Sequence, residues 1–144
     1  MKTWLKILLV LLVLGIVAII LVYVFYYNKP HPDFEKMKPD YSMAAADLYN
    51  AFLSDIKGAE AKYSGKVIEM QGMLAKVESN DSTVIAVFVF NQGMFGDEGI
   101  RCFMLKKYQE ETRLLQPQSN VTIKGYCAGY NDPDVVIEQA CIIK

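Results

Sequence analysis

The sequence has very few of the residues on which most catalytic sites depend. It contains one histidine, three cysteines and one tryptophan in 144 residues. The single histidine, His31, lies in a proline-containing stretch, so the usual Ser-His or Cys-His arrangement of nucleophilic catalysis is missing. No Cys-x-x-Cys, Gly-x-Gly-x-x-Gly or phosphate-binding loop occurs, and no Cys or His lies near His31 at metal-ligand spacing. The sequence therefore predicts a non-enzymatic protein with no cofactor and no metal site.

Charge is absent from one long segment. Residues 7–27 contain no charged residue, no Asn, no Gln and no Pro. At about 1.5 Å per residue, such a helix can cross a hydrocarbon core of about 30 Å. It lacks the polar face of a soluble helix. Trp4 at one end and tyrosines at the other suit the membrane interfaces. We predict a transmembrane helix over residues 7–27, in contact with membrane lipid, after a short basic tail, residues 1–6.

A cleaved signal peptide is the competing interpretation of this segment. Signal peptides have an apolar stretch of about 7–15 residues followed by small residues at the cleavage site. Here the stretch is longer, and residues 22–27 are bulky. No cysteine follows the apolar run, so lipid modification of a new N-terminus is not supported. The pattern therefore favours an uncleaved anchor.

The flanking charges bear on membrane orientation. Lys2 and Lys6 precede the helix, and the lysines after it are mixed with acidic residues, so the positive-inside count is nearly balanced. A short, wholly basic N-terminal tail usually stays in the cytoplasm. We therefore expect a single-pass membrane protein whose domain is extracytoplasmic, on the periplasmic side.

The rest of the chain has an excess of negative charge. Without Lys2 and Lys6, 13 Lys and Arg remain against 16 Asp and Glu, a net charge of −3 for residues 28–144. Proteins that bind nucleic acid neutralise phosphates with clustered Lys and Arg. The acidic balance therefore argues against general nucleic-acid binding.

Prolines and alanines divide the region after the helix. Residues 28–41 contain three prolines, which remove amide donors and favour extended backbone, so we predict a stiff linker. Residues 42–62 carry apolar side chains at helical spacing, with Ser42 as a plausible N-cap and Gly58 as a weak point. We predict one helix there, within a domain spanning residues 42–144.

Strand patterns follow the predicted helix. They cover residues 67–77, 83–90, 99–105, 120–128 and 134–143, with a loop at 91–99 and a short helix within 106–116. Five strands with a helix between the third and the fourth fit a five-stranded Greek-key barrel of the OB-fold type. The expected fold class is mainly β, and an open α+β sheet is the alternative.

Two segments of this region carry a family resemblance. Residues 45–52 form a helix pattern with a leucine and an aromatic residue, and residues 59–72 contain Tyr63-Ser64-Gly65-Lys66 before Gly72. Together with the later strands at 121–127 and 135–141, they resemble the tRNA_anti-like family of bacterial OB-fold proteins. The resemblance covers residues 43–143 and implies an OB fold, often in membrane-anchored or lipoprotein-like proteins. It implies no catalytic residues, because fold does not determine function.

The three cysteines, Cys102, Cys127 and Cys141, all fall in predicted strands. Two of them could form a disulfide in an external compartment. A turn near residue 132 places Cys127 opposite a residue near 137, so a Cys127–Cys141 bond would be strained. In an OB barrel the fifth strand lies beside the third, which would allow Cys102–Cys141. Three free buried thiols are the alternative.

Candidate ligand-binding residues follow from the expected barrel, because OB-fold ligands usually lie over the second and third strands and the loops beside them. Arg101 is informative because strands seldom bury an unpaired charge. Met94 and Phe95 lie between glycines, where they either fold back as a lid or contact a partner. The candidate residues are Arg101, Phe103, Met94, Phe95, Lys106, Tyr126 and Tyr130.

These observations predict a non-enzymatic, membrane-anchored OB-fold binding module at the cell envelope. Its partner would be a protein or another envelope component. The alternative is a single-stranded nucleic-acid binding domain, for tRNA- or ssDNA-like ligands, which rests on fold analogy and is disfavoured by the acidic charge.

Overall fold

A computed structural model describes residues 2–27 and 32–144 of the chain. Residues 28–31, which hold Pro30, His31 and the first part of the predicted linker, lie outside the described residues. The chain divides into two compact units, Met1–Pro32 and Asp33–Lys144, and each is treated by itself.

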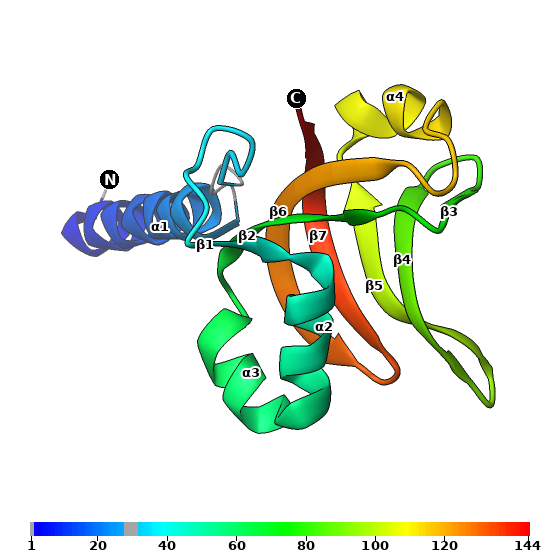
Figure 1. Cartoon of the computed structure of the whole chain (residues 1–144). Coiled ribbons are helices and arrows are strands. Elements are labelled where there is room, and N and C mark those ends of the chain that lie inside the picture. Colours follow the sequence, from blue (N-terminus) through cyan, green and yellow to red (C-terminus); the bar gives the residue numbers. More distant parts are fainter. Residues whose placement is uncertain (1, 28–31) are drawn as a thin grey trace. The chain divides into compact units, whose positions relative to one another are not determined.

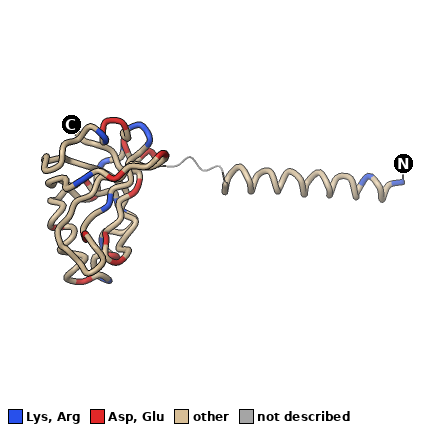
Figure 2. The backbone as a smooth tube through the Cα atoms, turned by 90° about the vertical axis from the view of Figure 1, so that its right-hand side faces the viewer, with Lys and Arg blue, Asp and Glu red and all other residues tan. Residues whose placement is uncertain are grey.

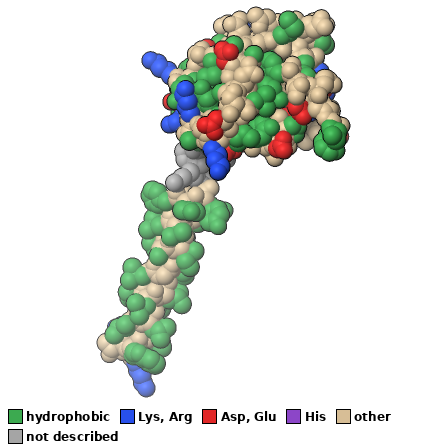
Figure 3. All heavy atoms as spheres, turned by 60° about the horizontal axis from the view of Figure 1, so that its bottom comes forward, with side chains coloured by type: hydrophobic (Ala, Val, Ile, Leu, Met, Phe, Trp, Pro, Cys, Tyr) green, Lys and Arg blue, Asp and Glu red, His purple; other side chains and the backbone are tan. Residues whose placement is uncertain are grey.

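The first unit contains α1 (Thr3–Val22), which continues into one turn of π-helix, η1 (Tyr23–Tyr27). No residue of α1 or η1 is buried. Figure 2 shows charged residues only near the N-terminal end of this helix, and Figure 3 shows hydrophobic side chains along its length. Thr3–Tyr27 is therefore long and apolar enough to cross a membrane. It begins four residues before the predicted span and ends at the same residue.

The second unit is a strongly curved sheet with helices at its ends (Figure 1). Its strands pair in the order β1-β2-β6-β7-β5-β4-β3. The strands are β1 (Tyr41–Ala44), β2 (Val67–Met73), β3 (Lys76–Ser79), β4 (Val84–Gly93), β5 (Gly96–Met104), β6 (Asn120–Asn131) and β7 (Asp134–Ile143). The helices are α2 (Ala45–Ser54), α3 (Ile56–Tyr63), the 3-10 turn η2 (Lys106–Tyr108) and α4 (Gln109–Arg113).

The prediction of a five-stranded barrel is wrong in strand number and in closure, because the sheet has seven strands and is open between β1 and β3. One extra strand arises because the first predicted strand is divided at Leu74–Ala75. The amide of Leu74 donates to Ser119 on one side (2.9 Å), and that of Ala75 donates to Val87 on the other (2.9 Å). The chain therefore changes its pairing partner between β2 and β3. A mainly β unit is confirmed.

The second extra strand comes from the start of the predicted helix. Tyr41–Ala44 is extended and pairs in parallel with β2, so Ser42 does not cap a helix. The helix itself is broken at Asp55, whose backbone is extended (φ −156°, ψ 92°) and whose carboxylate accepts a bond from the Gly58 amide (3.1 Å). An aspartate in this position starts a new helix, which is why the break precedes the predicted one at Gly58.

The core lies between the concave face of the sheet and α2. Leu48, Tyr49 and Phe52 of α2 are fully buried against the sheet, where Phe88 of β4 is also inaccessible. Gly72 is required at this contact, because a Cβ there would lie 2.9 Å from the Cβ of Ala45 and 3.3 Å from the Phe88 ring. These contacts fix the start of α2 on the sheet.

The second half of the predicted linker is folded onto this unit. We call residues Asp33–Asp40 the strap. The ammonium group of Lys124, a residue only 7% exposed, donates to the carbonyl oxygens of Glu35 (2.7 Å) and Met37 (2.9 Å). The Glu35 carboxylate accepts bonds from Lys107 (2.7 Å) and Tyr108 (2.5 Å).

Two further contacts hold the ends of the strap. Phe34 packs against Tyr126, with ring centroids 5.2 Å apart. The backbone of Asp40 donates to Val67 (2.7 Å), and its carboxylate accepts from the Val67 amide (2.9 Å). The strap is therefore part of the globular unit, whereas the sequence predicted a spacer through residue 41. The proline pattern did not reveal it, because its partners lie on β2 and β6 and in η2.

Replacing Lys124 tests the strap. Lys124→Met keeps the apolar stem but removes two charge-assisted hydrogen bonds, so the free energy of unfolding should fall by about 1–3 kcal/mol. The strap backbone should also become more accessible to hydrogen exchange. Lys36→Met is the matched control, because its side chain is 85% exposed and pairs only with Asp33 at the surface. Equal unfolding energies for the two variants would contradict this assignment.

Candidate interaction site

The β4–β5 hairpin carries the most exposed large apolar side chains of the described globular unit. Met94 is 92% exposed and Phe95 is 99% exposed. They form a two-residue turn between Gly93 and Gly96, which pair across the hairpin. Gly96 has φ of +124°, a conformation that favours glycine. The backbone of this turn therefore presents both side chains to solvent, and we call Met94 and Phe95 the tip.

Side-chain hydrogen bonds brace the hairpin directly below the tip. The Asn91 amide donates to Glu98 (2.7 Å), and the Gln92 amide donates to Asp97 (2.5 Å). These pairs lie across the strands in register, beyond a bulge that follows Val89. The predicted loop at 91–99 is thus largely hairpin. Of the two alternatives for Met94 and Phe95, folding back as a lid is excluded in this structure.

Arg101 is held in a network of ion pairs on the outer face of the sheet. Its guanidinium donates to Asp134 (2.8 Å) and to Glu78 (2.6 Å). Lys76 bridges Glu78 (3.1 Å) and Asp97 (3.0 Å). The network joins β3, β5 and β7, and through Asp97 it reaches the base of the hairpin. It therefore fixes the hairpin to the rest of the sheet.

The ion pairs shift the titration of their members. The hydrogen bond to Asp134 raises the pKa of Arg101, and the bond to Glu78 adds to this. Burial acts to raise the pKa of Glu78, but hydrogen bonds from Lys76 and Arg101 outweigh it and hold the pKa below the ordinary value. The hydrogen bond from Lys76 lowers the pKa of Asp97, and Gln92 contributes. Arg101, Glu78 and Asp97 are thus stabilised in their charged forms.

The network leaves little positive charge for a ligand on this face. One row of residues crosses this face from β3 to β4, β5 and β7: Lys76, Val87, Arg101 and Val136. Val87, between the two cations, is only 2% exposed. Both cations of the row are bound to carboxylates. A phosphate would have to displace those carboxylates before it could be neutralised here.

Phe103 and Lys106 lie together in a second place. They line an open depression of about 490 Å³ with Leu105, Glu138 and Gln139. Gln139 has φ of +52° at a bulge where β5 and β7 lose register. Non-glycine residues seldom adopt this conformation, which is found where the surrounding structure enforces it.

Tyr126 and Tyr130 both pack against other aromatic side chains of the globular unit. Tyr126 packs on Phe34 of the strap. Tyr130 stacks on Phe52 of α2 (6.2 Å), and its hydroxyl donates to Asp132 (3.2 Å). The predicted site residues are thus separated into the tip, the ion-pair network, the depression and these two packed tyrosines. The sequence did not predict Asp97, Glu98 or Glu78, whose roles depend on strand register.

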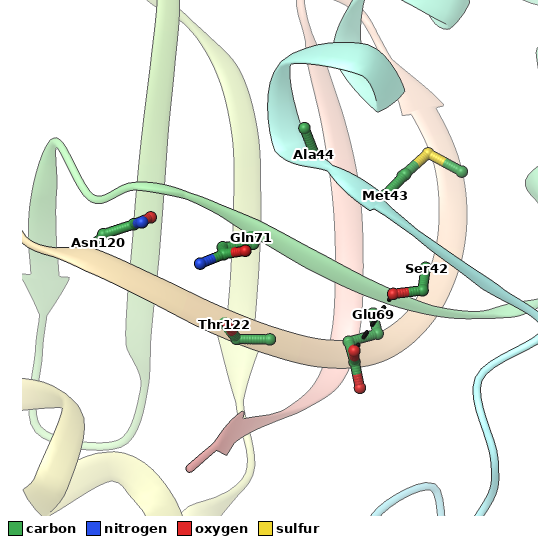
Figure 4. A pocket seen from close by; sticks show the side chains of 7 residues that line it. All are labelled: Ser42, Met43, Ala44, Glu69, Gln71, Asn120 and Thr122. Carbon is green, nitrogen blue, oxygen red and sulfur yellow. Dashed lines mark hydrogen bonds between the residues drawn. The ribbon is translucent and has the colours of Figure 1, made fainter.

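A polar groove of about 500 Å³ lies on the outer face of β1, β2 and β6 (Figure 4). Figure 4 shows the Ser42 hydroxyl bonded to Glu69 at one end (3.2 Å), and Gln71, Asn120 and Thr122 at the other. Met43 and Ala44 complete the lining. No Lys, Arg or aromatic residue lines the groove, so it lacks the charge and the stacking platform of a single-stranded nucleic-acid site.

The site offers no reactive thiol or metal centre in the part of the chain that the structure describes. Cys102, Cys127 and Cys141 are free and at most 1% exposed, so the free-thiol alternative is the one the structure contains. Burial raises the pKa of Cys102 and raises that of Cys127 to about 11. Cys127 lies opposite Ile137, as predicted. No group of three His, Cys, Asp or Glu side chains among the described residues is placed to hold a metal ion.

Comparison with known families gives the chain its classification. The tRNA_anti-like family model matches residues 1–142, which is almost the whole chain. The chain belongs to the tRNA_anti-like family. No protein with a curated description matches the sequence significantly.

One solved structure supports the fold of this family member, and a second shows a weaker likeness. A lipoprotein of Klebsiella pneumoniae, whose nucleic-acid binding is a provisional assignment, matches with TM-score 0.56 and 15% identity, over 81% of this chain and 100% of that one. An aspartyl tRNA synthetase of Entamoeba histolytica matches with TM-score 0.47 and 13% identity, over 81% of this chain and 24% of that one. At these identities the first likeness shows the fold alone, and the second is too remote to support an argument.

The ion-pair network makes a prediction about acid stability. Because the pKa values of Glu78 and Asp97 are lowered on folding, their contribution is present above the unfolded values, near 4.5 and 3.8, and is lost as pH falls through the folded values. The melting temperature should therefore be nearly constant from pH 6 to 8 and fall below about pH 4.5.

Glu78→Gln should give a shallower fall over the acid range, because one titrating member is gone. Glu110→Gln is the control, since its side chain is 86% exposed and forms a surface pair. Identical acid profiles for the wild type and Glu78→Gln would show that the network does not titrate with folding.

Proposed function

We propose that this protein is a membrane-tethered, non-enzymatic module of the cell envelope that binds a protein partner through the tip of the β4–β5 hairpin. The observation that carries the proposal is the almost complete exposure of Met94 and Phe95 on a braced hairpin. Large apolar side chains that fill a pocket in a partner provide much of the energy of protein interfaces. A rigid hairpin lowers the entropy lost on binding.

The charges beside the tip indicate the chemistry of the partner. Asp97 and Glu98 lie directly below Met94 and Phe95, and Asp134 lies at the other side of the ion-pair network. The network and Glu98 together hold two cations, Lys76 and Arg101, against four carboxylates, so this surface is negative on balance. A complementary partner surface would have an apolar pocket with a basic rim, which would favour association and select against acidic surfaces.

The tether follows from the first unit. We infer that Thr3–Tyr27 is retained as a single transmembrane anchor in contact with lipid. Because the strap begins at Asp33, only residues 28–32 lie between helix and globular unit, fewer than the sequence predicted. The basic tail with Lys2 and Lys6 favours an extracytoplasmic domain. Protease added to spheroplasts, whose periplasmic membrane face is accessible, should digest the domain. Survival of the domain until the spheroplasts are lysed would reverse this orientation.

We infer further that the globular unit is an OB-type barrel in its connectivity. If β2 and β3 are two halves of one coiled strand, the strands β2/β3, β4, β5, β6 and β7 number five. Their pairing, with β5 parallel to β7, is then that of the OB fold. The family membership supports this inference, and β1 is then an addition at the edge.

Single-stranded nucleic-acid binding is the second candidate. It is favoured by the name of the Klebsiella lipoprotein and by Phe103 and Lys106, which line one depression. It is disfavoured by the paired state of Lys76 and Arg101, because backbone recognition needs cations that are available to phosphates.

The tip is tested with Met94→Ser/Phe95→Ser in the full chain. Both side chains are exposed, so the melting temperature should not change, but recovery of the partner from solubilised membranes of the source cells should fall at least about tenfold. Leu114→Ser is the control, because Leu114 is also exposed (78%) but lies after α4. Unchanged recovery with the double variant would contradict the proposal.

The second candidate is tested by titrating labelled single-stranded oligonucleotides into the full chain in detergent at low salt. We expect no saturable binding below about 100 μM, since non-specific nucleic-acid affinity comes mainly from phosphate contacts. Saturable binding that weakens steeply with salt and is lost in Lys106→Ala would favour the nucleic-acid function instead.

A further inference from the structure

The two ends of the sheet differ in how they are protected. Edge strands present unpaired backbone groups, and natural proteins shield them with charged residues, prolines or bulges. At one end, β3 carries Lys76 and Glu78, which belong to the ion-pair network. At the other end, β1 has the sequence Tyr41-Ser42-Met43-Ala44, without charge or proline. Among the described strands, β1 pairs only with β2.

The side chains of β1 alternate between the core and solvent. Tyr41 and Met43 are partly buried against the hydrophobic core, whereas Ser42 and Ala44 are exposed. The exposed pair borders the polar groove, and Figure 4 shows both residues on the strand that forms its wall. A strand added beside β1 would therefore extend the sheet without placing any charged side chain of β1 in the new contact.

Opposite charges lie at the two ends of β1. Lys62 of α3 sits over the ring of Tyr41 (5.7 Å) at the start of the strand. Asp47, in the first turn of α2, is exposed just beyond its end. An antiparallel copy of β1 would bring the Lys62 end of one chain toward the Asp47 end of the other, and the symmetry would repeat this pairing. The exposed Asp40 also lies at the Lys62 end, directly before β1, where its carboxylate accepts a hydrogen bond from the Val67 amide (2.9 Å). The complementarity is therefore limited to the two Lys62–Asp47 pairs.

We propose that two copies of this chain associate through β1, edge to edge and antiparallel, around a two-fold axis close to Ser42. The contact is isologous, as in most homodimers, and it joins the two sheets into one. It uses a surface separate from the tip, so it does not depend on the proposed partner binding.

The length of β1 sets the strength of this association. Four residues extend about 14 Å and form few main-chain hydrogen bonds. The pairing is therefore weak in dilute solution. A transmembrane anchor confines copies to one bilayer in the same orientation, which raises their local concentration and is compatible with a two-fold axis along the bilayer normal. The association depends on the full chain in a membrane.

The two-fold axis restricts the register. An axis perpendicular to the sheet keeps exposed residues opposite exposed residues, so Ser42 lies opposite either Ser42 or Ala44 of the second copy. Directly opposed residues in antiparallel strands have Cα atoms about 4.5–5.5 Å apart, within the range that a disulfide can bridge. The native cysteines are at most 1% exposed and do not compete under mild oxidation.

Cysteine crosslinking of the full chain in phosphatidylcholine vesicles tests the proposal. Ser42→Cys alone is compared with an equal mixture of Ser42→Cys and Ala44→Cys chains, at high lipid-to-protein ratio. We expect one of the two samples to give at least about a fivefold higher yield of disulfide dimer than Ser79→Cys, a control on the exposed end of β3. Yields no higher than that of Ser79→Cys would overturn the proposal. The same low yields are expected if β1 pairs with a strand of another protein, so that outcome also counts against a homodimer.

A second measurement separates β1 pairing from association of the apolar helices. Energy transfer between labelled full chains in the same vesicles should fall to the level of random proximity in Ser42→Lys, because a charge is placed on the paired edge. The melting temperature should be unchanged, since Ser42 is exposed. Energy transfer that persists in Ser42→Lys would show that α1 alone associates the chains, and would overturn the proposal.

Discussion

The change of pairing partner at Leu74–Ala75 is the constraint on which the globular unit depends. Leu74 bonds toward β6 and Ala75 bonds toward β4, so one short segment connects both arms of the curved sheet. Two residues earlier, Gly72 lets α2 and Phe88 approach the same point. Closing the core with α2 therefore requires this bend, and the bend positions β4 and β5, whose hairpin carries Met94 and Phe95.

Two long-range networks then hold the strap and the base of the β4–β5 hairpin. Lys124 fixes the strap, which connects the globular unit to the chain leading to the apolar helix. Arg101 fixes the base of the hairpin by joining strands β3, β5 and β7. Both are strong cationic donors, and both are committed to internal acceptors. These two cations therefore serve the fold, and the proposed recognition is left to the exposed apolar tip and its acidic surroundings.

The sequence predicts correctly the elements that a local residue pattern determines. It does not predict the elements and ion pairs that depend on contacts with distant residues. The strand at 134–143 and the position of Cys127 opposite Ile137 follow from alternation and turn chemistry. Tyr41–Ala44 has a helix-like context, but pairing with β2 makes it a strand. Arg101 pairs with Glu78, 23 residues away, and with Asp134, 33 residues away. The sequence therefore shows an unusual arginine but not its ion pairs.

Photo-crosslinking from position 95 in intact membranes of the source cells tests protein binding by the tip most directly. A photoreactive phenylalanine analogue replaces Phe95 in one full-length chain and Leu114 in another. A protein-binding tip should give one discrete protein adduct from position 95 that is absent from position 114 and is lost when Met94 is also changed to Ser. Adducts that are the same from both positions, or crosslinks from position 95 to nucleic acid, would contradict a protein-binding tip.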